Sequence, residues 1–134
     1  MRLLVSVFFI FSVSLQAAET AKIHTVPLSS IRLTDGPFLY SEQTNLQYLL
    51  ALDADKLLAP LRREAGMKSK VESYGNWENS GLDGHMLGHY LSALAFMGSA
   101  TANQQIKARL DYLLTELEKI QQAQQGYLGG VPGS

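Results

Sequence analysis

The chain of 134 residues has no cysteine, a single tryptophan and no excess of either charge. The absence of cysteine excludes a disulfide scaffold and any metal site built on thiolates in this stretch. The net charge of −1 gives none of the basic surface that nucleic-acid binding needs. Because 46% of the residues are hydrophobic, a disordered or collagen-like chain is also excluded. The composition therefore indicates a small globular chain of at most one domain.

The first 17 residues are predicted to be a secretory signal peptide. Arg2 gives a short positive start, residues 3–13 are almost all apolar, and the small residues Ala17 and Ala18 mark the cleavage site. The apolar run is shorter than the roughly 20 residues of a membrane-spanning helix, so a retained membrane anchor is the less favoured alternative. We expect a protein exported to the bacterial periplasm or the extracellular space, with no membrane attachment after cleavage.

The segment after the signal peptide is predicted to be a short extended arm that leads into helices. This arm covers residues 18–40 and includes a turn at residues 35–37, which read Asp-Gly-Pro. Ser41 is expected to cap the first helix, and Pro60 to end or kink it. A polar loop, residues 65–82, follows. Loops of this length are usually functional when they are not linkers.

Two further helices are expected to form a hairpin with an inner and an outer member. The inner helix would begin at Asp83 and run to about Gly98, and no long charged side chain occurs from residue 84 to 102. A helix without a charged face is buried. The outer helix, roughly residues 104–123, would be capped by Asn103 or Thr101 and has an apolar stripe with a charged back. The fold class is therefore all-α.

The two expected faces of the inner helix differ in chemistry. On a helical wheel one face holds leucines, which suit the leucine stripe of the outer helix: Leu87, Leu91 and Leu94 against Leu110, Leu113 and Leu117. The opposite face carries His85 and His89, which are four residues apart. Three interpretations stay open for the histidines: hydrogen-bonded core residues, sugar-binding groups in a lumen, or metal ligands. A metal is the least favoured because no third ligand accompanies them, so no metal site is predicted.

Two other side chains are candidate sugar-binding groups. Asp83 would either cap the inner helix or accept hydrogen bonds from sugar hydroxyls. Trp77 would either offer a ring face to sugar C–H groups, with the Glu78 carboxylate beside it for hydroxyls, or plug the loop onto the core. The predicted substrate-binding set is Trp77, Asp83, His85 and His89. No residue of the chain is assigned as catalytic, because nothing fixes the spacing of a carboxylate pair.

Several separated strings resemble one known family. They are PLSSIRL at 27–33, DGPF at 35–38, the segment 45–62, YGNWE at 74–78, LDGHMLGHYLSALA at 82–95 and GYLGGVP at 126–132. Together they are similar to the start of the β-L-arabinofuranosidase family, glycoside hydrolase family 127 and its relatives, formerly a domain of unknown function. The resemblance covers residues 26–133 in order.

The resemblance implies that residues 41–134 are the opening helices of a six-hairpin (α/α) toroid. Members of this family remove terminal β-L-arabinofuranosyl units from plant glycans, using a cysteine nucleophile held by zinc and a glutamate acid/base. Those residues lie beyond the matched segment, and this chain has no cysteine. We therefore expect this chain to be the N-terminal segment of an exported glycoside hydrolase, and to hold no cofactor of its own. It would need the remainder of the catalytic domain, where the resemblance implies zinc. The alternative is a non-catalytic helical module that binds carbohydrate or protein.

Overall fold

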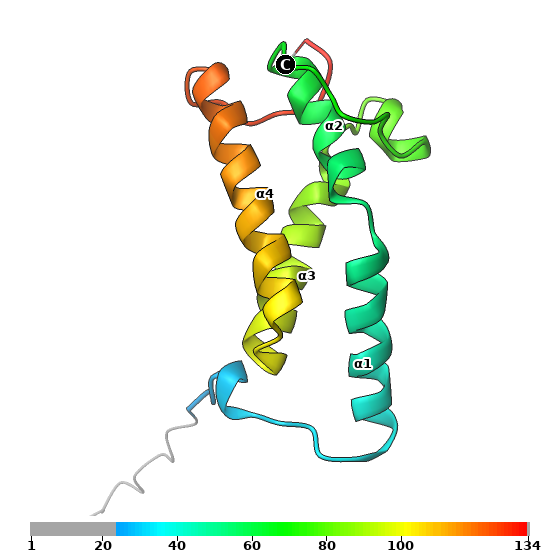
Figure 1. Ribbon diagram of the computed structural model, residues 1–134, viewed down its shortest axis with the longest axis vertical. Coiled ribbons are helices and arrows are strands. Elements are labelled where there is room, and N and C mark those ends of the chain that lie inside the picture. The colour runs from blue at the N-terminus through cyan, green and yellow to red at the C-terminus, as the bar shows by residue number, and fades with distance from the viewer. Residues whose placement is uncertain (1–23, 134) are drawn as a thin grey trace, which may run out of the picture.

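The structure is a computed structural model that describes residues 24–133 and is all-α over that range. Figure 1 shows its four α-helices, which are preceded by a short 3-10 turn, η1 (Leu28–Ser30), and interrupted by a second one, η2 (Asn76–Asn79). No strand occurs within the described residues. The predicted signal peptide lies outside them. The all-α prediction is confirmed for this range, and its arrangement in helical pairs is consistent with the opening of an (α/α) toroid.

The first helix, α1 (Gly36–Ala51), begins earlier than the sequence suggested. The Asp35 carboxylate accepts a hydrogen bond from the Gly36 N–H (2.6 Å). Pro37 follows in the first turn, where a backbone N–H has no acceptor within the helix, so the lack of an N–H in proline costs nothing there. Ser41 lies inside α1, and its hydroxyl donates to the Pro37 carbonyl (2.9 Å). The predicted cap at Ser41, and the arm boundary at residue 40, are therefore wrong.

The chain breaks at Leu52 and Asp53 rather than at Pro60. Leu52 has an extended backbone (ψ 134°), and the Asp53 carboxylate accepts from the Asp55 N–H (2.9 Å), so a new helix, α2 (Ala54–Glu64), begins there. This helix continues through Pro60, whose side chain is fully buried. The prediction that Pro60 ends or kinks the first helix is wrong, because the cap at Asp53 has already ended it.

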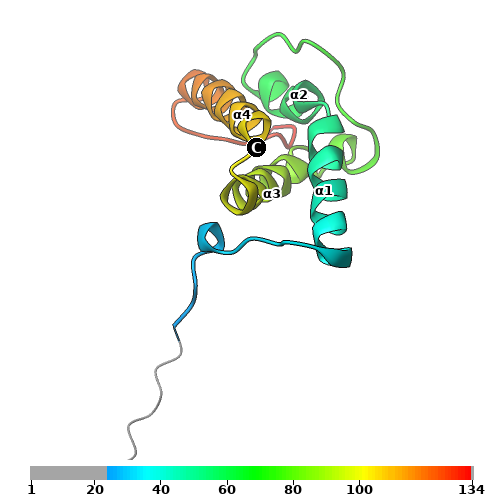
Figure 2. The ribbon, with the colours of Figure 1, turned by 60° about the horizontal axis from the view of Figure 1, so that its bottom comes forward.

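The predicted hairpin is confirmed in α3 (His85–Thr101) and α4 (Gln104–Ala123). The side chain of Asn103 accepts from the N–H groups of Gln105 (2.9 Å) and Ile106 (3.1 Å), so the expected cap and the bounds of the outer helix are correct. Figure 2 shows α3 flanked by α4 on one side and α1 on the other. The core lies where α2, α3 and α4 meet, and its buried members include Leu57, Leu58, Leu61, Leu87, Leu94, Ile106, Leu113, Leu117 and Ile120.

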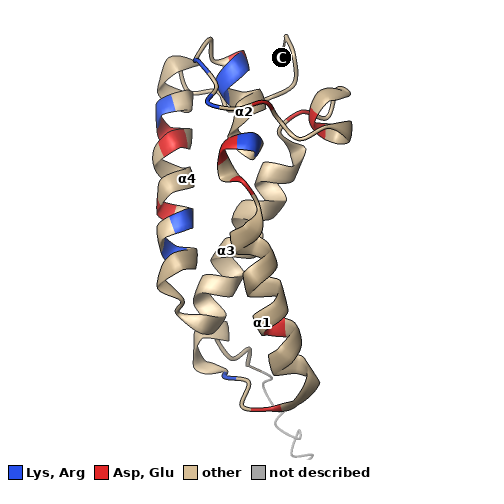
Figure 3. Ribbon diagram, turned by 45° about the vertical axis from the view of Figure 1, so that its right-hand side comes forward, with Lys and Arg blue, Asp and Glu red and all other residues tan. Residues whose placement is uncertain are grey.

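The inner helix is buried on one face only. Leu87 and Leu94 are buried, and Leu91 is partly buried against the same core. The opposite face is exposed in the described chain, with Phe96 68% exposed and both His85 and His89 exposed. Figure 3 shows that α3 carries no charged residue along its length, whereas α4 carries both acidic and basic residues. The expectation of a fully buried helix is therefore met on only one side of α3.

A buried ion-pair network joins α2 to α4. The guanidinium of Arg62 is 1% exposed and donates to Asp55 (2.8 Å) and to Glu116 (2.6 Å). Lys119 also pairs with Glu116 (2.7 Å). A buried charge needs such partners, because an unpaired one costs several kcal/mol, on the order of 3–5 when a partner is removed. Arg62 thus fixes the register of α2 on α4.

Among the described helices, none is both long and apolar enough to span a membrane.

Candidate functional site

Three aromatic rings form a continuous exposed row at the start of α3. Trp77 lies on η2, and its ring centroid is 5.9 Å from that of His85, the first residue of α3. The rings of His85 and His89 meet edge to face, with centroids 4.7 Å apart. Trp77 is 58% exposed, and both histidines are exposed. We call Trp77, His85 and His89 the ring row. The structure thus brings together three of the four predicted site residues, and both histidines lie outside the core of the described residues.

The two imidazoles of the ring row are hydrogen-bonded to each other. Their Nε2 atoms are 3.2 Å apart, so one ring donates its proton and the other accepts it. The helix imposes this contact, because side chains four residues apart lie on the same face. Each imidazole keeps its Nδ1 for an outside partner. The pair can therefore donate and accept hydrogen bonds beside the indole face of Trp77.

The fourth predicted residue, Asp83, is not on this surface. It is 5% exposed, and its two oxygens accept from the Arg63 guanidinium (2.8 Å) and from the Gly81 N–H (3.1 Å). Burial raises the pKa of Asp83, but the hydrogen bonds from Arg63 and Gly81 and the positive charge of Arg63 together lower it by more, so the pKa lies below its usual value. Asp83 does not cap α3: Gly84, in the left-handed region (φ 84°), holds the N-cap position. Its predicted contact with sugar stays a prediction, although both oxygens are already engaged.

The capping of α3 falls instead to Glu78, which the sequence pattern paired with Trp77 as a sugar-binding carboxylate. Glu78 is 2% exposed, and its two oxygens accept from the N–H groups of Gly84 (2.9 Å) and Met86 (3.0 Å). A carboxylate at a helix N-terminus satisfies free amides and interacts favourably with the helix dipole. Glu78 follows Trp77 directly in the sequence, and its two hydrogen-bond donors, Gly84 and Met86, flank His85. This cap therefore fixes the position of the Trp77 ring relative to the His85 ring.

A glycine-rich segment packs behind the same corner. A Cβ added to Gly130 would lie 2.8 Å from the Asp83 carbonyl oxygen, so a side chain there would force the backbone to move. The Gly130 carbonyl also accepts from Arg63 (3.3 Å). This close approach explains why position 130 is a glycine. Arg63, Asp83 and Gly130 together fix the start of α3 from behind.

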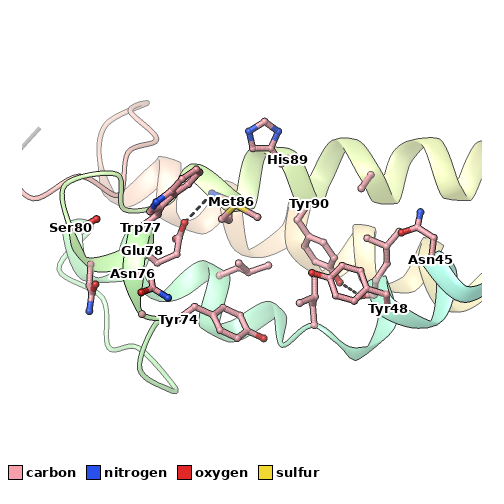
Figure 4. Close-up of a pocket in the computed structure, with 16 residues that line it drawn as sticks. Asn45, Tyr48, Tyr74, Asn76, Trp77, Glu78, Ser80, Met86, His89 and Tyr90 are labelled. Carbon is pink, nitrogen blue, oxygen red and sulfur yellow. Dashed lines mark hydrogen bonds between the residues drawn. The ribbon is translucent and has the colours of Figure 1, made fainter.

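A cavity of about 1050 Å³ adjoins the ring row. Figure 4 shows tyrosines from three elements on its walls: Tyr48 from α1, Tyr74 from the loop and Tyr90 from α3. Trp77 and His89 also line it, whereas Asp83 and His85 do not. The Tyr90 hydroxyl donates to the Leu49 carbonyl (2.7 Å), which fixes that ring. The walls offer aromatic faces and a few amide and hydroxyl groups, the composition of many small-molecule sites.

The described residues contain no group of three ligands for the zinc that the family resemblance implies. No group of three or more His, Cys, Asp or Glu side chains within residues 24–133 is arranged to hold a metal ion, and the sequence contains no thiolate ligand. The two carboxylates nearest the ring row, Glu78 and Asp83, are buried and hydrogen-bonded to the protein. No zinc chemistry is therefore assigned to these residues.

Residues 30–134 match the family model described as the β-L-arabinofuranosidase, GH127 catalytic domain. This match includes every α-helix of the described residues, as well as the ring row and the cavity beside it. A search of curated proteins finds no match to the chain.

Proposed function

The chain belongs to the β-L-arabinofuranosidase family defined by the GH127 catalytic domain, and from this premise we propose that it forms part of the sugar-facing wall of an exported glycoside hydrolase. Its substrate would be an arabinose-containing plant glycan. Family membership supports glycoside hydrolysis as the reaction class. The choice of sugar rests on the family resemblance of the sequence.

The observation that carries this proposal is the exposed ring row beside the cavity. Sugars present C–H groups on one face and hydroxyls at their edges, so a site for them pairs an aromatic face with hydrogen-bonding groups. Trp77 supplies such a face. The His85–His89 pair, whose ring centroids lie 4.7 Å apart, supplies hydrogen-bond donors and acceptors. We assign substrate contact to these three side chains and treat Glu78 as the residue that positions them.

The remainder of the catalytic domain would complete the site. The exposed face of α3 lacks charged residues and leaves large apolar side chains such as Phe96 in water. Leaving a large apolar side chain exposed forfeits about 1.5–3 kcal/mol of burial free energy. We propose that further helices of the catalytic domain cover this face, and that the cysteine nucleophile, the zinc and the acid/base glutamate lie there.

The experiment that tests the site compares His85→Ala with His24→Ala, since His24 lies outside the ring row. In the chain joined to the remainder of its catalytic domain, His85→Ala should lower kcat/KM for a β-L-arabinofuranoside at least about tenfold, the loss expected for one hydrogen bond to substrate. The melting temperature should stay unchanged because His85 is exposed. Equal kinetics for the two variants would contradict the assignment of His85.

Export is tested by N-terminal sequencing of the protein recovered from the periplasm or the medium. We expect the mature chain to start at Ala18 or within a few residues of it, because small residues mark the cleavage site there. A recovered protein that still begins at Met1 would contradict this proposal.

A non-catalytic binding module is the second candidate. It is favoured by the cavity, which could hold a ligand, and by the engagement of Glu78 and Asp83 with protein groups. This alternative predicts saturable binding of an arabinofuranoside with no hydrolysis even when the remainder of the catalytic domain is present. Measured turnover would exclude it.

A further inference from the structure

The two histidines of the ring row have the geometry of a bidentate metal chelate. We propose that His85 and His89 bind one divalent transition-metal ion of the Cu²⁺, Ni²⁺ and Zn²⁺ class through their Nε2 atoms. The proposal rests on the placement of these atoms, 3.2 Å apart on an exposed helical face, and is independent of the glycosidase function.

The separation of the two nitrogens matches the span of a shared ion. Two imidazole nitrogens at about 2.0–2.1 Å from a tetrahedral metal ion lie roughly 3.3 Å from each other. A square-planar ion, the geometry that Cu²⁺ and Ni²⁺ prefer, brings them to about 2.9 Å. The distance in the structure falls between these values. An ion can therefore replace the proton that the pair shares, with small rotations of the two side chains.

The proton balance of this exchange is simple. In the free pair one ring carries its proton on Nε2 and donates it to the other ring. When the ion binds, that ring takes the tautomer with its proton on Nδ1, so both Nε2 lone pairs face the metal. Because both rings are exposed, solvent can carry the proton between the two nitrogens. A neutral pair thus binds the ion without net release of a proton.

The surroundings define the class of ion and the strength of binding. Imidazole suits Cu²⁺, Ni²⁺ and Zn²⁺, whereas Mg²⁺ and Ca²⁺ require oxygen ligands. No third His, Cys, Asp or Glu ligand joins the pair within residues 24–133, so water would fill the other positions. The positive end of the α3 dipole opposes a cation, but the Glu78 carboxylate at that end offsets it. We expect modest affinity that follows the order Cu²⁺, then Ni²⁺, with no response to Mg²⁺.

The chain contains its own reporter for this site. Trp77 is the single tryptophan, and its ring centroid lies 5.9 Å from that of His85. A paramagnetic ion held by the pair would lie next to the indole and quench its emission. The experiment is a titration of the full chain with CuCl₂, followed by Trp77 fluorescence, and then addition of EDTA to restore the signal.

Matched variants decide the outcome. His85→Gln and His89→Gln should each weaken the apparent affinity for Cu²⁺ at least about tenfold, the loss typical of a disrupted ligand set. His24→Gln, which removes the third histidine of the chain, should leave the titration unchanged. Circular dichroism of each variant checks that the helices are retained. Absence of saturable quenching in the unmodified chain overturns the proposal, and so does quenching that survives in His85→Gln and His89→Gln. Failure here leaves the comparison of His85→Ala with His24→Ala in glycoside kinetics as a separate test of the proposed function.

Discussion

Removal of the Glu78 carboxylate should release the start of α3 without disturbing the rest of the helix. Glu78 accepts two backbone hydrogen bonds, from Gly84 (2.9 Å) and Met86 (3.0 Å), and it is 2% exposed. In Glu78→Ala both amides lose this partner. Hydrogen bonds to charged groups contribute about 1.5–3 kcal/mol each, although the released amides regain part of this from water. The favourable interaction with the helix dipole, about 0.3–1 kcal/mol, is also lost.

We therefore expect Glu78→Ala to lower the free energy of unfolding by about 2–4 kcal/mol. Glu78→Gln keeps one acceptor oxygen but loses the charge and one hydrogen bond, so its cost should be smaller, about 1–3 kcal/mol. The matched control is Glu72→Ala, which removes an exposed carboxylate from the same loop and should change stability by no more than about 0.5 kcal/mol. Urea denaturation of the full chain, monitored by circular dichroism, measures all three.

Hydrogen exchange separates a local effect from a global one. The amides of Gly84 and Met86 should exchange faster in Glu78→Ala than the loss of global stability explains, because they lose their direct acceptor. The Leu94 amide, deep in α3, should change only with the global free energy of unfolding. Equal stability of Glu78→Ala and Glu72→Ala, or unchanged exchange at Gly84 and Met86, would refute the capping role of Glu78.

Two further predictions concern the core and the response to acid. Leu94→Ala should lower the free energy of unfolding by about 2–5 kcal/mol, because Leu94 is fully buried. Leu114→Ala, at a residue that is 53% exposed, should change it by no more than about 0.5 kcal/mol. Urea denaturation measures both values. The chain should also lose stability below about pH 4–5, because the folded-state pKa values of Asp83 and Glu116 are lowered. At Asp83, burial raises the pKa, but the hydrogen bonds from Arg63 and Gly81 and the Arg63 charge together lower it by more. At Glu116, the hydrogen bond from Lys119 is the largest cause of the lowered pKa. A lowered folded pKa stabilises the folded state above the unfolded pKa, and this stability is lost as the pH falls through the folded value. Urea midpoints that stay constant from pH 6 to pH 3 would contradict this linkage.

The outer helix shows why some elements could be predicted from the sequence. Asn103 precedes a stripe of apolar residues at spacings of three and four, with charged residues between them. Both signals are local, and they agree, so the cap and the bounds at 104–123 are correct. Leu114 follows the same spacing, but it lies at the edge of the apolar face and is 53% exposed.

The errors at Asp83 and Glu78 arose because a distant partner replaced a local one. Asp83 stands at the position of a helix cap, but Arg63, twenty residues earlier, binds its carboxylate and leaves the cap to Glu78. Glu78 acts on amides six and eight residues away, which no short capping pattern contains. The Arg62 network likewise joins residues fifty-four positions apart, so its buried charge could not be foreseen before α2 and α4 were placed together.

The exposed face of α3 combines two chemistries that follow each other along one helical stripe. His85 and His89 occupy its first two turns, next to Trp77, whereas Ser92 and Phe96 continue the same stripe toward the C-terminal end. Polar rings therefore lie at the end where Glu78 fixes the backbone, and the apolar ring of Phe96 lies at the end farthest from the η2 loop. Ligand contact requires fixed geometry, whereas helix packing requires only a complementary apolar surface. This division explains why the same uncharged face can hold a candidate site at one end and a surface for further helices at the other.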